Sequence, residues 1–333
     1  MKFARLGLIV NPSAGGGDSL KIARQAVQAL APSEIFVGVG EMGADALSDT
    51  ASTLQSFDWR SYTGKARTPF LVECFAKENV DALVVIGGDG TLADVALALR
   101  KKYLIPLLGI GAGSANVGPL MTCLGKNVGQ LAHAKFSTQV VDGLIAGVND
   151  VPLGLGFNDV VIGVTVLATQ DSRLIDVDAV EKMQGRNVPR EPESIGSENA
   201  RVIKKSPRAE TLVAEGKRVV TIIAGLPDER FYGKAIAGGV LLSGLTGDPA
   251  GCLVCDHLLV RTKLDAQWFR QSEPVISSYV GLNETEKILT SGLRDGAVLC
   301  ADGNPLAILR PTDVAFVTVQ RALAHSIRIE ESA

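Results

Sequence analysis

The chain has 333 residues, of which 46% are hydrophobic and 21% are charged. This length allows two domains, and the composition is typical of a folded globular protein rather than a disordered one. The formal net charge is −3 and basic residues are scattered along the chain, so we expect no nucleic-acid partner.

The first residues of the chain and the positions of its cysteines indicate where in the cell the protein is expected. The first apolar run ends at Asn11-Pro12, too early for a signal peptide, and no uninterrupted apolar segment is long enough to span a membrane. The five cysteines lie mostly within apolar runs, as expected of reduced thiols. We therefore expect a cytoplasmic protein without a membrane partner.

Cys252, Cys255 and His257 raise the question of a metal or redox site. A lone C-x-x-C lacks a second ligand pair, which favours buried strand residues. Zinc or redox chemistry stays open as the alternative.

The first part of the chain alternates between strand and helix patterns. We predict strands at 6–10, 34–39, 81–86 and 105–110, and helices at about 18–30, 43–55, 69–78 and 91–102. This alternation predicts a parallel sheet covered by helices. Glycine-rich loops at 13–17, 87–90 and 111–113 follow three of these strands, at the edge where such sheets bind ligands.

The stretch Gly87-Gly88-Asp89-Gly90-Thr91 is the most informative of these loops. Its glycines allow a tight strand-to-helix turn, at which backbone N–H groups and the helix N-terminus bind an anion. We expect Thr91 to cap the helix. A carboxylate beside bound phosphates repels them unless it holds a metal ion or accepts a proton, so Asp89 points to phosphoryl transfer.

Beyond residue 138 short strand patterns with frequent glycine prevail. We predict strands at 139–145, 151–155, 157–168, 218–224, 234–242, 251–260, 297–301, 306–309 and 314–319. A helix is expected near 283–291, with Asn283 and Glu286 as a capping box. The polar, proline-bearing stretch 181–217 is interpreted as a solvated loop, with a lid or an oligomer contact as alternatives.

The stretch 87–91 resembles the signature of the NAD kinase and diacylglycerol kinase superfamily. Residues 8–17, Phe157–Ile162 and Cys300–Asn304 match further elements of that superfamily. Arg173–Asp178 is similar to the ATP-NAD kinase-like branch associated with acetoin catabolism. The resemblance implies an α/β fold of two domains, with residues 1–137 as a parallel-sheet nucleotide-phosphate domain and 138–333 as a β-rich, sandwich-like substrate domain.

The resemblance also implies the site residues. Asp89 is expected to be catalytic, and ATP with Mg²⁺ and NAD are the expected ligands. The expected phosphate-binding residues are Asn11, Gly15, Gly16, Gly17, Gly87, Gly88, Gly90, Thr91, Gly113, Ser114 and Asn116. The acceptor-binding residues are Asn158, Asp159 and Asp302, although a turn before a strand and a hairpin turn at Asp302-Gly303 stay open for these.

The function implied is that of a small-molecule kinase that converts NAD to NADP. No Gly-Ser-Thr-Ala-Tyr stretch of NAD kinases is present, and residues 238–248 stand in its place. Alternatives are a diacylglycerol-type lipid kinase, supported by the loops at 11–17 and 111–116, a kinase for an acetoin-related metabolite, and a nucleotide-binding regulatory protein without turnover. The resemblance further implies a homo-oligomer.

Overall fold

The computed structural model describes residues 3–47, 50, 52–100, 102–112, 116, 118–170, 173–227, 242–263, 266–271 and 274–330. The chain forms two compact units, one of residues 1–141 with 322–333 and one of residues 142–321. We call them unit 1 and unit 2 and describe each by itself. The assignment of 1–137 and 138–333 to functional domains stays a prediction.

Unit 1 contains a parallel sheet with the strand order β3-β2-β1-β4-β5 and β6 beside β5. The strands are β1 (Arg5–Val10), β2 (Glu34–Gly38), β3 (Thr53–Phe57), β4 (Ala82–Gly87), β5 (Leu107–Gly111) and β6 (Met121–Leu124). The helices are α1 (Ser19–Leu30), α2 (Arg67–Lys77) and α3 (Asp89–Leu99). The predicted strand-helix alternation therefore gives the expected parallel sheet.

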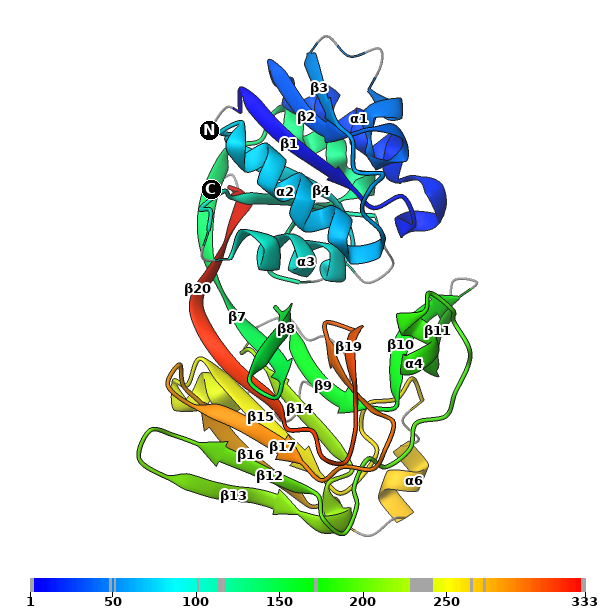
Figure 1. Cartoon of the computed structure of the whole chain (residues 1–333), viewed down its shortest axis with the longest axis vertical. Helices are drawn as coiled ribbons and strands as arrows, with labels where there is room; N and C mark the ends of the chain where they lie inside the picture. Colours follow the sequence, from blue (N-terminus) through cyan, green and yellow to red (C-terminus); the bar gives the residue numbers. More distant parts are fainter. Residues whose placement is uncertain are drawn as a thin grey trace. The chain divides into compact units, whose positions relative to one another are not determined.

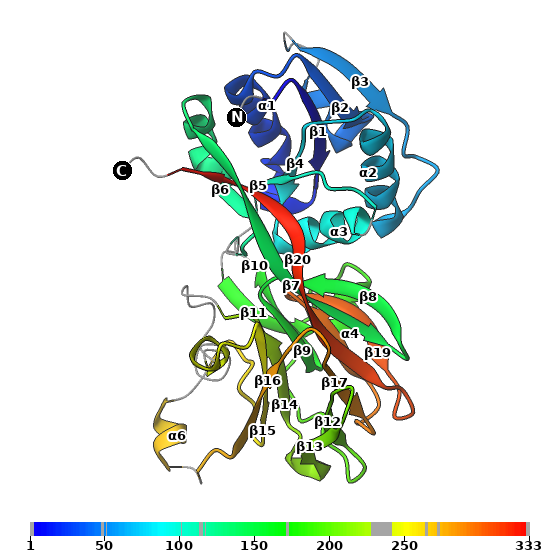
Figure 2. The same ribbon diagram turned by 90° about the vertical axis from the view of Figure 1, so that its left-hand side faces the viewer.

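The two faces of this sheet are covered by different helices (Figures 1 and 2). Leu8 and Val10 of β1 belong to the buried core that includes Ala23 of α1. Gly7 points the other way, and a Cβ there would lie 2.8 Å from the Phe75 ring of α2. Alternate residues of a strand face opposite sides, so β1 carries no polar side chain after Arg5 because both of its faces are buried there.

The helix predicted at about 43–55 is wrong. Short 3₁₀ turns at Gly40–Met42 and Ala44–Ala46 precede β3. Gly43 has φ = +128°, a conformation that side-chain-bearing residues rarely adopt and that ends a helix. The apolar spacing of this stretch reflects packing of Met42 and Leu47 into the core instead.

Unit 2 is built from antiparallel strands. One group of strands has the order β13-β12-β17-β20-β7-β8, a second has the order β16-β15-β14-β9-β18-β19, and β10 pairs with β11. The bounds are β7 (Phe136–Val148), β8 (Val151–Gly156), β9 (Asp159–Gly163), β10 (Thr165–Gln170), β11 (Arg173–Asp178), β12 (Arg201–Lys205), β13 (Glu210–Glu215), β14 (Thr221–Gly225), β15 (Ala250–Cys255), β16 (Ser277–Leu282), β17 (Lys287–Ser291), β18 (Ala297–Ala301), β19 (Asn304–Leu309) and β20 (Ala315–Ile329). Helices α4 (Ala179–Met183) and α6 (Ala266–Gln271) are short.

A buried core lies between the two groups of strands, with Val202 and Ile288 from one and Ile222 and Leu299 from the other. The fold class expected from the sequence, an α/β part followed by a β-rich part, is confirmed. The last residues of β20, from 322 on, belong to unit 1, where Ser326 pairs in parallel with Leu107 of β5.

The helix predicted near 283–291 is wrong, because these residues form a turn and β17. The Glu286 carboxylate does accept from the Asn283 backbone N–H at 2.9 Å, as in a capping box. Ile288 is buried and Leu289 is half-buried, with β12 on one side and β20 on the other. The alternation of period two, together with β-branched residues, decides in favour of the strand.

The solvated loop predicted at 181–217 is wrong for the residues that form two strands. Residues 201–205 and 210–215 form the hairpin of β12 and β13, and β12 pairs with β17. Charged residues stand at both ends of each of these short strands, which made the stretch resemble a polar loop.

Three further strand predictions need adjustment. The run 157–168 is divided into β9 and β10, which belong to different sheets. The run 251–260 is a strand only as far as Cys255. The run 234–242 lies outside the described residues, apart from helical Leu242.

Candidate functional site

The loop after β1 is joined to the start of α3 by a side-chain hydrogen bond. Asn11 follows the last residue of β1, and its Nδ2 donates to Thr91 Oγ1 at 3.0 Å. Its Oδ1 accepts from the backbone N–H of Ser13 at 3.1 Å, and its own backbone N–H donates to the Ile86 carbonyl at 2.9 Å. Asn11 thereby fixes the first glycine-rich loop against the carboxyl end of β4. Gly15–Gly17 follow in a 3₁₀ turn.

The glycine turn between β4 and α3 has the predicted position. β4 ends at Gly87, Gly88 is the N-cap of α3, and Asp89 lies in its first turn. A Cβ at Gly87 would lie 2.7 Å from Thr91 Oγ1, so glycine alone permits this approach. The capping role predicted for Thr91 is wrong, because the residue lies inside the helix and its hydroxyl accepts from Asn11.

Asp89 and Asn116 connect this turn to the third glycine-rich loop. The Asp89 Oδ1 atom accepts from the Gly118 backbone N–H at 3.0 Å. A Cβ at Gly111 would lie 2.6 Å from the Asn116 Cβ, and one at Gly88 would lie 3.8 Å from Asn116 Oδ1. Asn116 therefore lies beside both loops, as its predicted site role requires. Gly113 and Ser114 lie outside the described residues.

A pocket of about 210 Å³ opens beside Asn11 and Thr91, within unit 1. Two cationic side chains line it, Lys65 and Arg67, together with Asp94 of α3. We call it the N-terminal pocket. It lies where β1 ends and α3 begins, the edge at which parallel sheets of this kind bind ligands.

The charges of this pocket leave an excess of positive groups. Lys65 Nζ is 3.2 Å from Asp94 Oδ1. The guanidinium of Arg67 is 3.9 Å from the exposed carboxylate of Glu41 and lies over the Trp59 ring, 4.9 Å from its centroid. Burial raises the pKa of Asp94, and Lys65 lowers it in part. Of the charged side chains that line the pocket, two are cations and one is a carboxylate, so the pocket favours an anion.

Lys65 and Arg67 were missed by the sequence reasoning, although the sequence held a signal for them. Lys65 lies in the 3₁₀ turn Gly64–Ala66 directly before α2, and Arg67 is the first residue of α2, whose first turn has no acidic residue. The N-terminus of a helix carries partial positive charge, so cations are disfavoured there unless an anion joins them. Two basic residues shortly before the helix predicted at 69–78 are such a signal.

In unit 2 the predicted acceptor residues come together around the carboxylate of Asp302. It accepts hydrogen bonds from the backbone N–H groups of Phe157 at 2.7 Å, Asn158 at 2.8 Å and Asp159 at 3.1 Å. Asp302 and Gly303, with φ of +47° and +70°, also form the two-residue turn between β18 and β19. The hairpin-turn interpretation of Asp302-Gly303 is thus confirmed, and the same residue holds the segment that begins β9.

Two electrostatic features mark this cluster. Burial and the neighbouring Asp159 raise the pKa of Asp302 to about 7, against the three N–H donors, which lower it. The Asn158 Oδ1 atom is buried without a hydrogen-bond partner among the described residues. An orphaned buried acceptor of this kind is costly, and a donor on a ligand would satisfy it.

The cysteines of the C-x-x-C stretch are buried strand residues, as expected. Cys252 and Cys255 lie in β15 and are free, and burial raises the pKa of Cys252 to about 12. Cys255, Asp256 and His257 bring possible ligand atoms within 4.8 Å of one another. The Asp256 Oδ1 atom is already engaged, at 2.5 Å from His257 Nδ1 and 2.9 Å from the Ile276 backbone nitrogen. The hydrogen bonds of Asp256 therefore explain why Cys255, Asp256 and His257 lie close together.

Comparison with known proteins decides the family. Residues 6–122, which include the N-terminal pocket and the glycine turn, match the family model for the ATP-NAD kinase N-terminal domain. A protein of Archaeoglobus fulgidus described as uncharacterized is 30% identical over 312 residues, covering 92% of this chain and 93% of its own length. Residues 6–122 belong to the NAD kinase family. As a NAD kinase-like protein the chain is an ATP-dependent phosphotransferase with an alcohol group as acceptor, which confirms the kinase prediction.

One solved structure supports the fold, and it is that of a NADH kinase. The crystal structure of yeast NADH kinase complexed with NADH has a TM-score of 0.55 and 12% sequence identity, and covers 99% of this chain and 84% of that one. At this identity the likeness concerns the fold alone. An Archaeoglobus fulgidus NAD kinase in complex with ATP has a TM-score of 0.41 and 12% identity over 98% of this chain and 93% of its own.

The acetoin-associated branch within the family stays a prediction. The residues that suggested it have structural roles here: the Asp176 carboxylate accepts from the Thr262 backbone N–H at 2.9 Å, and Asp178 caps α4. In the described part of the chain, we find no helix whose length and apolar character would let it cross a membrane.

Proposed function

We propose that this NAD kinase-like protein transfers the γ-phosphoryl group of ATP to a hydroxyl on the adenosine ribose of NAD. The ribose oxygen forms a bond to the γ-phosphorus, and the bond from that phosphorus to the β–γ bridging oxygen breaks. The observation that carries the proposal is the position of Asp89, in the first turn of α3 directly after the glycine turn. A carboxylate there accepts the proton of the attacking hydroxyl or helps to hold the metal.

The phosphates of ATP are proposed to bind at the ends of β1 and β4. The backbone N–H groups of the glycine turn and the N-terminus of α3 face an anion there. Lys65 and Arg67 add the positive charge that these loops lack. The full proposed phosphate set comprises Asn11, Gly15–Gly17, Gly87, Gly88, Gly90, Thr91, Gly113, Ser114 and Asn116, joined by Lys65 and Arg67.

Magnesium fits the donors present near the glycine turn. Asp89 offers carboxylate oxygens in the first turn of α3, and Mg²⁺ binds oxygen ligands, keeping waters and phosphate oxygens as its other ligands. Asp89 would hold the ion. When bound, the ion would neutralise charge on the transferring phosphates.

Asn158, Asp159 and Asp302 are proposed to serve the acceptor. A carboxylate beside a ribose accepts hydrogen bonds from its hydroxyls, which suits Asp159. The orphaned Oδ1 of Asn158 supports a ligand donor at this position. Asp302 acts as a positioning residue, because its carboxylate holds the backbone of both other residues.

Three further properties are proposed on the family resemblance: magnesium as the metal, a cytoplasmic location and a homo-oligomeric state. A homo-oligomer is tested by sedimentation velocity of the full chain, which should give a mass above 34.9 kDa.

The function is tested by incubating the protein with ATP, Mg²⁺ and NAD and measuring NADP with an NADP-specific coupled enzyme. NADH, a diacylglycerol in mixed micelles, and acetoin-related alcohols are offered in parallel with labelled ATP. The proposal expects NADP to form, with NAD or NADH as the preferred acceptor. Label found only in a lipid or in a small alcohol would assign the enzyme to another acceptor and overturn the NAD proposal.

A further inference from the structure

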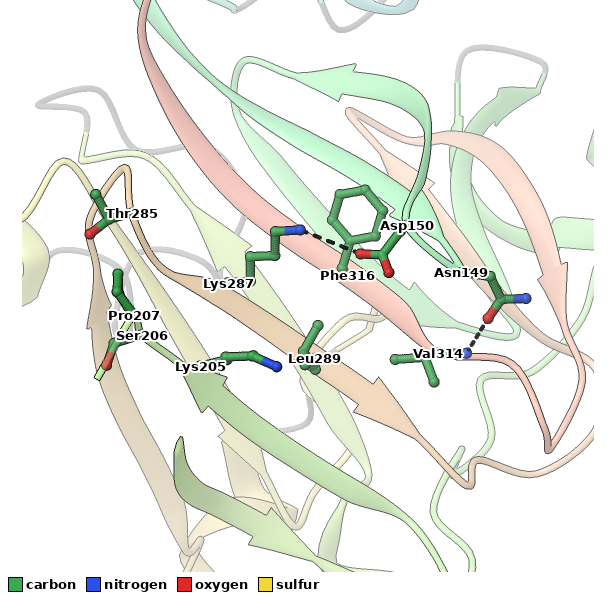
Figure 3. A pocket seen from close by; sticks show the side chains of 10 residues that line it. All are labelled: Asn149, Asp150, Lys205, Ser206, Pro207, Thr285, Lys287, Leu289, Val314 and Phe316. Carbon is green, nitrogen blue, oxygen red and sulfur yellow. Dashed lines mark hydrogen bonds and ion pairs between the residues drawn. The ribbon is translucent and has the colours of Figure 1, made fainter. Parts of the chain in front are cut away.

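A second pocket lies in unit 2, on the outer face of the sheet formed by β12, β17 and β20. Its volume is about 530 Å³, within the range of small-molecule sites. Its walls come from the turn at Asn149-Asp150 and from residues near Ser206 and Thr285, as Figure 3 shows. We call it the lysine pocket, after Lys205 and Lys287.

The two lysines stand directly opposite each other on neighbouring strands. Lys205 of β12 pairs in register with Lys287 of β17, so both side chains leave the same face of the sheet. Like charges at directly opposite positions destabilise a sheet. The opposed lysines therefore destabilise the free protein, and a bound partner would offset the repulsion between them.

The carboxylates near these lysines offset their charge only weakly. Lys287 Nζ is 3.4 Å from Asp150 Oδ1, and the Asp150 side chain is 87% exposed. Lys205 Nζ is 3.2 Å from Glu210 Oε1, and both side chains are more than half exposed. Exposed ion pairs contribute little and exchange readily with other anions. Among the residues that line the pocket, two lysines face the single carboxylate of Asp150.

The floor beneath the lysines is apolar. Leu289 of β17 pairs in register with Phe316 of β20, and Val314 lines the pocket beside them. Lys287 Nζ lies 5.2 Å from the centroid of the Phe316 ring. A ligand in this pocket would therefore meet an apolar surface below and ammonium groups at its side, as the sticks in Figure 3 make visible.

One wall of the pocket is held in place before any ligand binds. Asn149 and Asp150 both have positive φ, +50° and +62°, as in a tight hairpin turn. Asn149 Oδ1 accepts from the Val314 backbone N–H at 2.9 Å, and its Nδ2 donates to Asp313 Oδ1 at 3.0 Å. A preformed wall lowers the ordering cost of binding.

We propose that the lysine pocket binds a small organic anion. This ligand consists of an apolar group, about the size of a benzene ring, to which a carboxylate or a phosphate is attached. The apolar group rests on Leu289, Phe316 and Val314, and the anionic group lies between Lys205 and Lys287. The carboxylate and the phosphate share this chemistry, and the experiment distinguishes them.

The test uses isothermal titration calorimetry at low ionic strength with four probes: phenyl phosphate, benzoate, inorganic phosphate and benzyl alcohol. The proposal expects phenyl phosphate or benzoate to bind more tightly than inorganic phosphate or the uncharged alcohol. The double variant Lys205→Met/Lys287→Met keeps the apolar stems and should weaken the tighter probe at least tenfold. Lys217→Met is the matched control, since Lys217 pairs with Glu198 outside the pocket.

The comparison between parent and double variant distinguishes probe binding in this pocket from probe binding at phosphate sites elsewhere in the protein. Without ligand, the double variant should have a Tm equal to or above that of the parent, because two opposed charges are gone. Equal probe affinities in parent and double variant would overturn the proposal. A change in oligomeric state of the double variant, seen by sedimentation velocity, would show an interface between copies and would likewise overturn it.

Discussion

The two pockets carry positive charge in different ways. The N-terminal pocket lies where β1 ends, beside Thr91 in the first turn of α3, and the glycine-rich turn between β4 and α3 directly precedes that residue. The lysine pocket lies on the face of an antiparallel sheet, and its anion-binding groups are side chains from separate strands. The first kind of site leaves a local motif in the sequence, and the second leaves none.

The largest expected effect concerns Asp89, the side chain at the glycine turn that we propose to accept the proton of the attacking hydroxyl or to help hold the metal. Asp89→Asn should lower kcat by about 10²- to 10⁴-fold, the usual contribution of a proton-transferring group. Asp58→Asn is the control, because Asp58 is exposed in the same unit and pairs with Arg60. Steady-state kinetics with ATP and NAD measure both, and an unchanged kcat in Asp89→Asn would remove this residue from the chemistry.

The second effect is a pH-dependent stability set by Asp302. Its pKa is about 7 in the folded protein, against an ordinary value of 3.8. Between these values the folded state keeps a proton that the unfolded chain has lost, so stability falls as pH rises and levels off above pH 7. The total loss is at most about 4 kcal/mol. Urea unfolding of Asp302→Asn should show a flatter profile from pH 4 to pH 7, and an identical slope in both proteins would contradict this assignment.

The third effect tests the close packing of the glycine turn. Gly87→Ala places a methyl group 2.7 Å from Thr91 Oγ1 and should lower the free energy of unfolding by about 1–3 kcal/mol. Gly129→Ala is the matched control, because no atom lies within 4 Å of a Cβ there. Thermal unfolding of both variants gives the comparison. Equal Tm values would mean that the turn has room for a side chain.

The smallest expected effect tests whether the cations of the N-terminal pocket contact the phosphates of ATP. Lys65→Met should raise the KM for ATP about tenfold, the loss expected for one charge-assisted contact, with a smaller change in kcat. Lys77→Met is the control, since Lys77 lies on the surface of α2 and pairs with Glu73. If both variants keep the parent KM, the pocket does not hold the phosphates of ATP.

The same difference between local and distant contacts decides how much of the fold and of the site the sequence could predict. The strands and turns around Gly87–Thr91 were predictable because each depends on neighbours in the chain. The partner of Thr91 was not, because Asn11 lies 80 residues away. The strand β17 was taken for a helix, since Asn283 and Glu286 make the same local hydrogen bond in a turn as in a capping box. The opposition of Lys205 and Lys287 depends on strand register across 82 residues, which no local pattern specifies.

The most direct test of the account is a single-turnover reaction of the protein with γ-labelled ATP, Mg²⁺ and unlabelled NAD, followed by chromatographic separation of the products. We expect label in NADP with the parent protein, and label that enters NADP about 10²- to 10⁴-fold more slowly with Asp89→Asn. Label released only as inorganic phosphate, at the same rate with and without NAD, would contradict it.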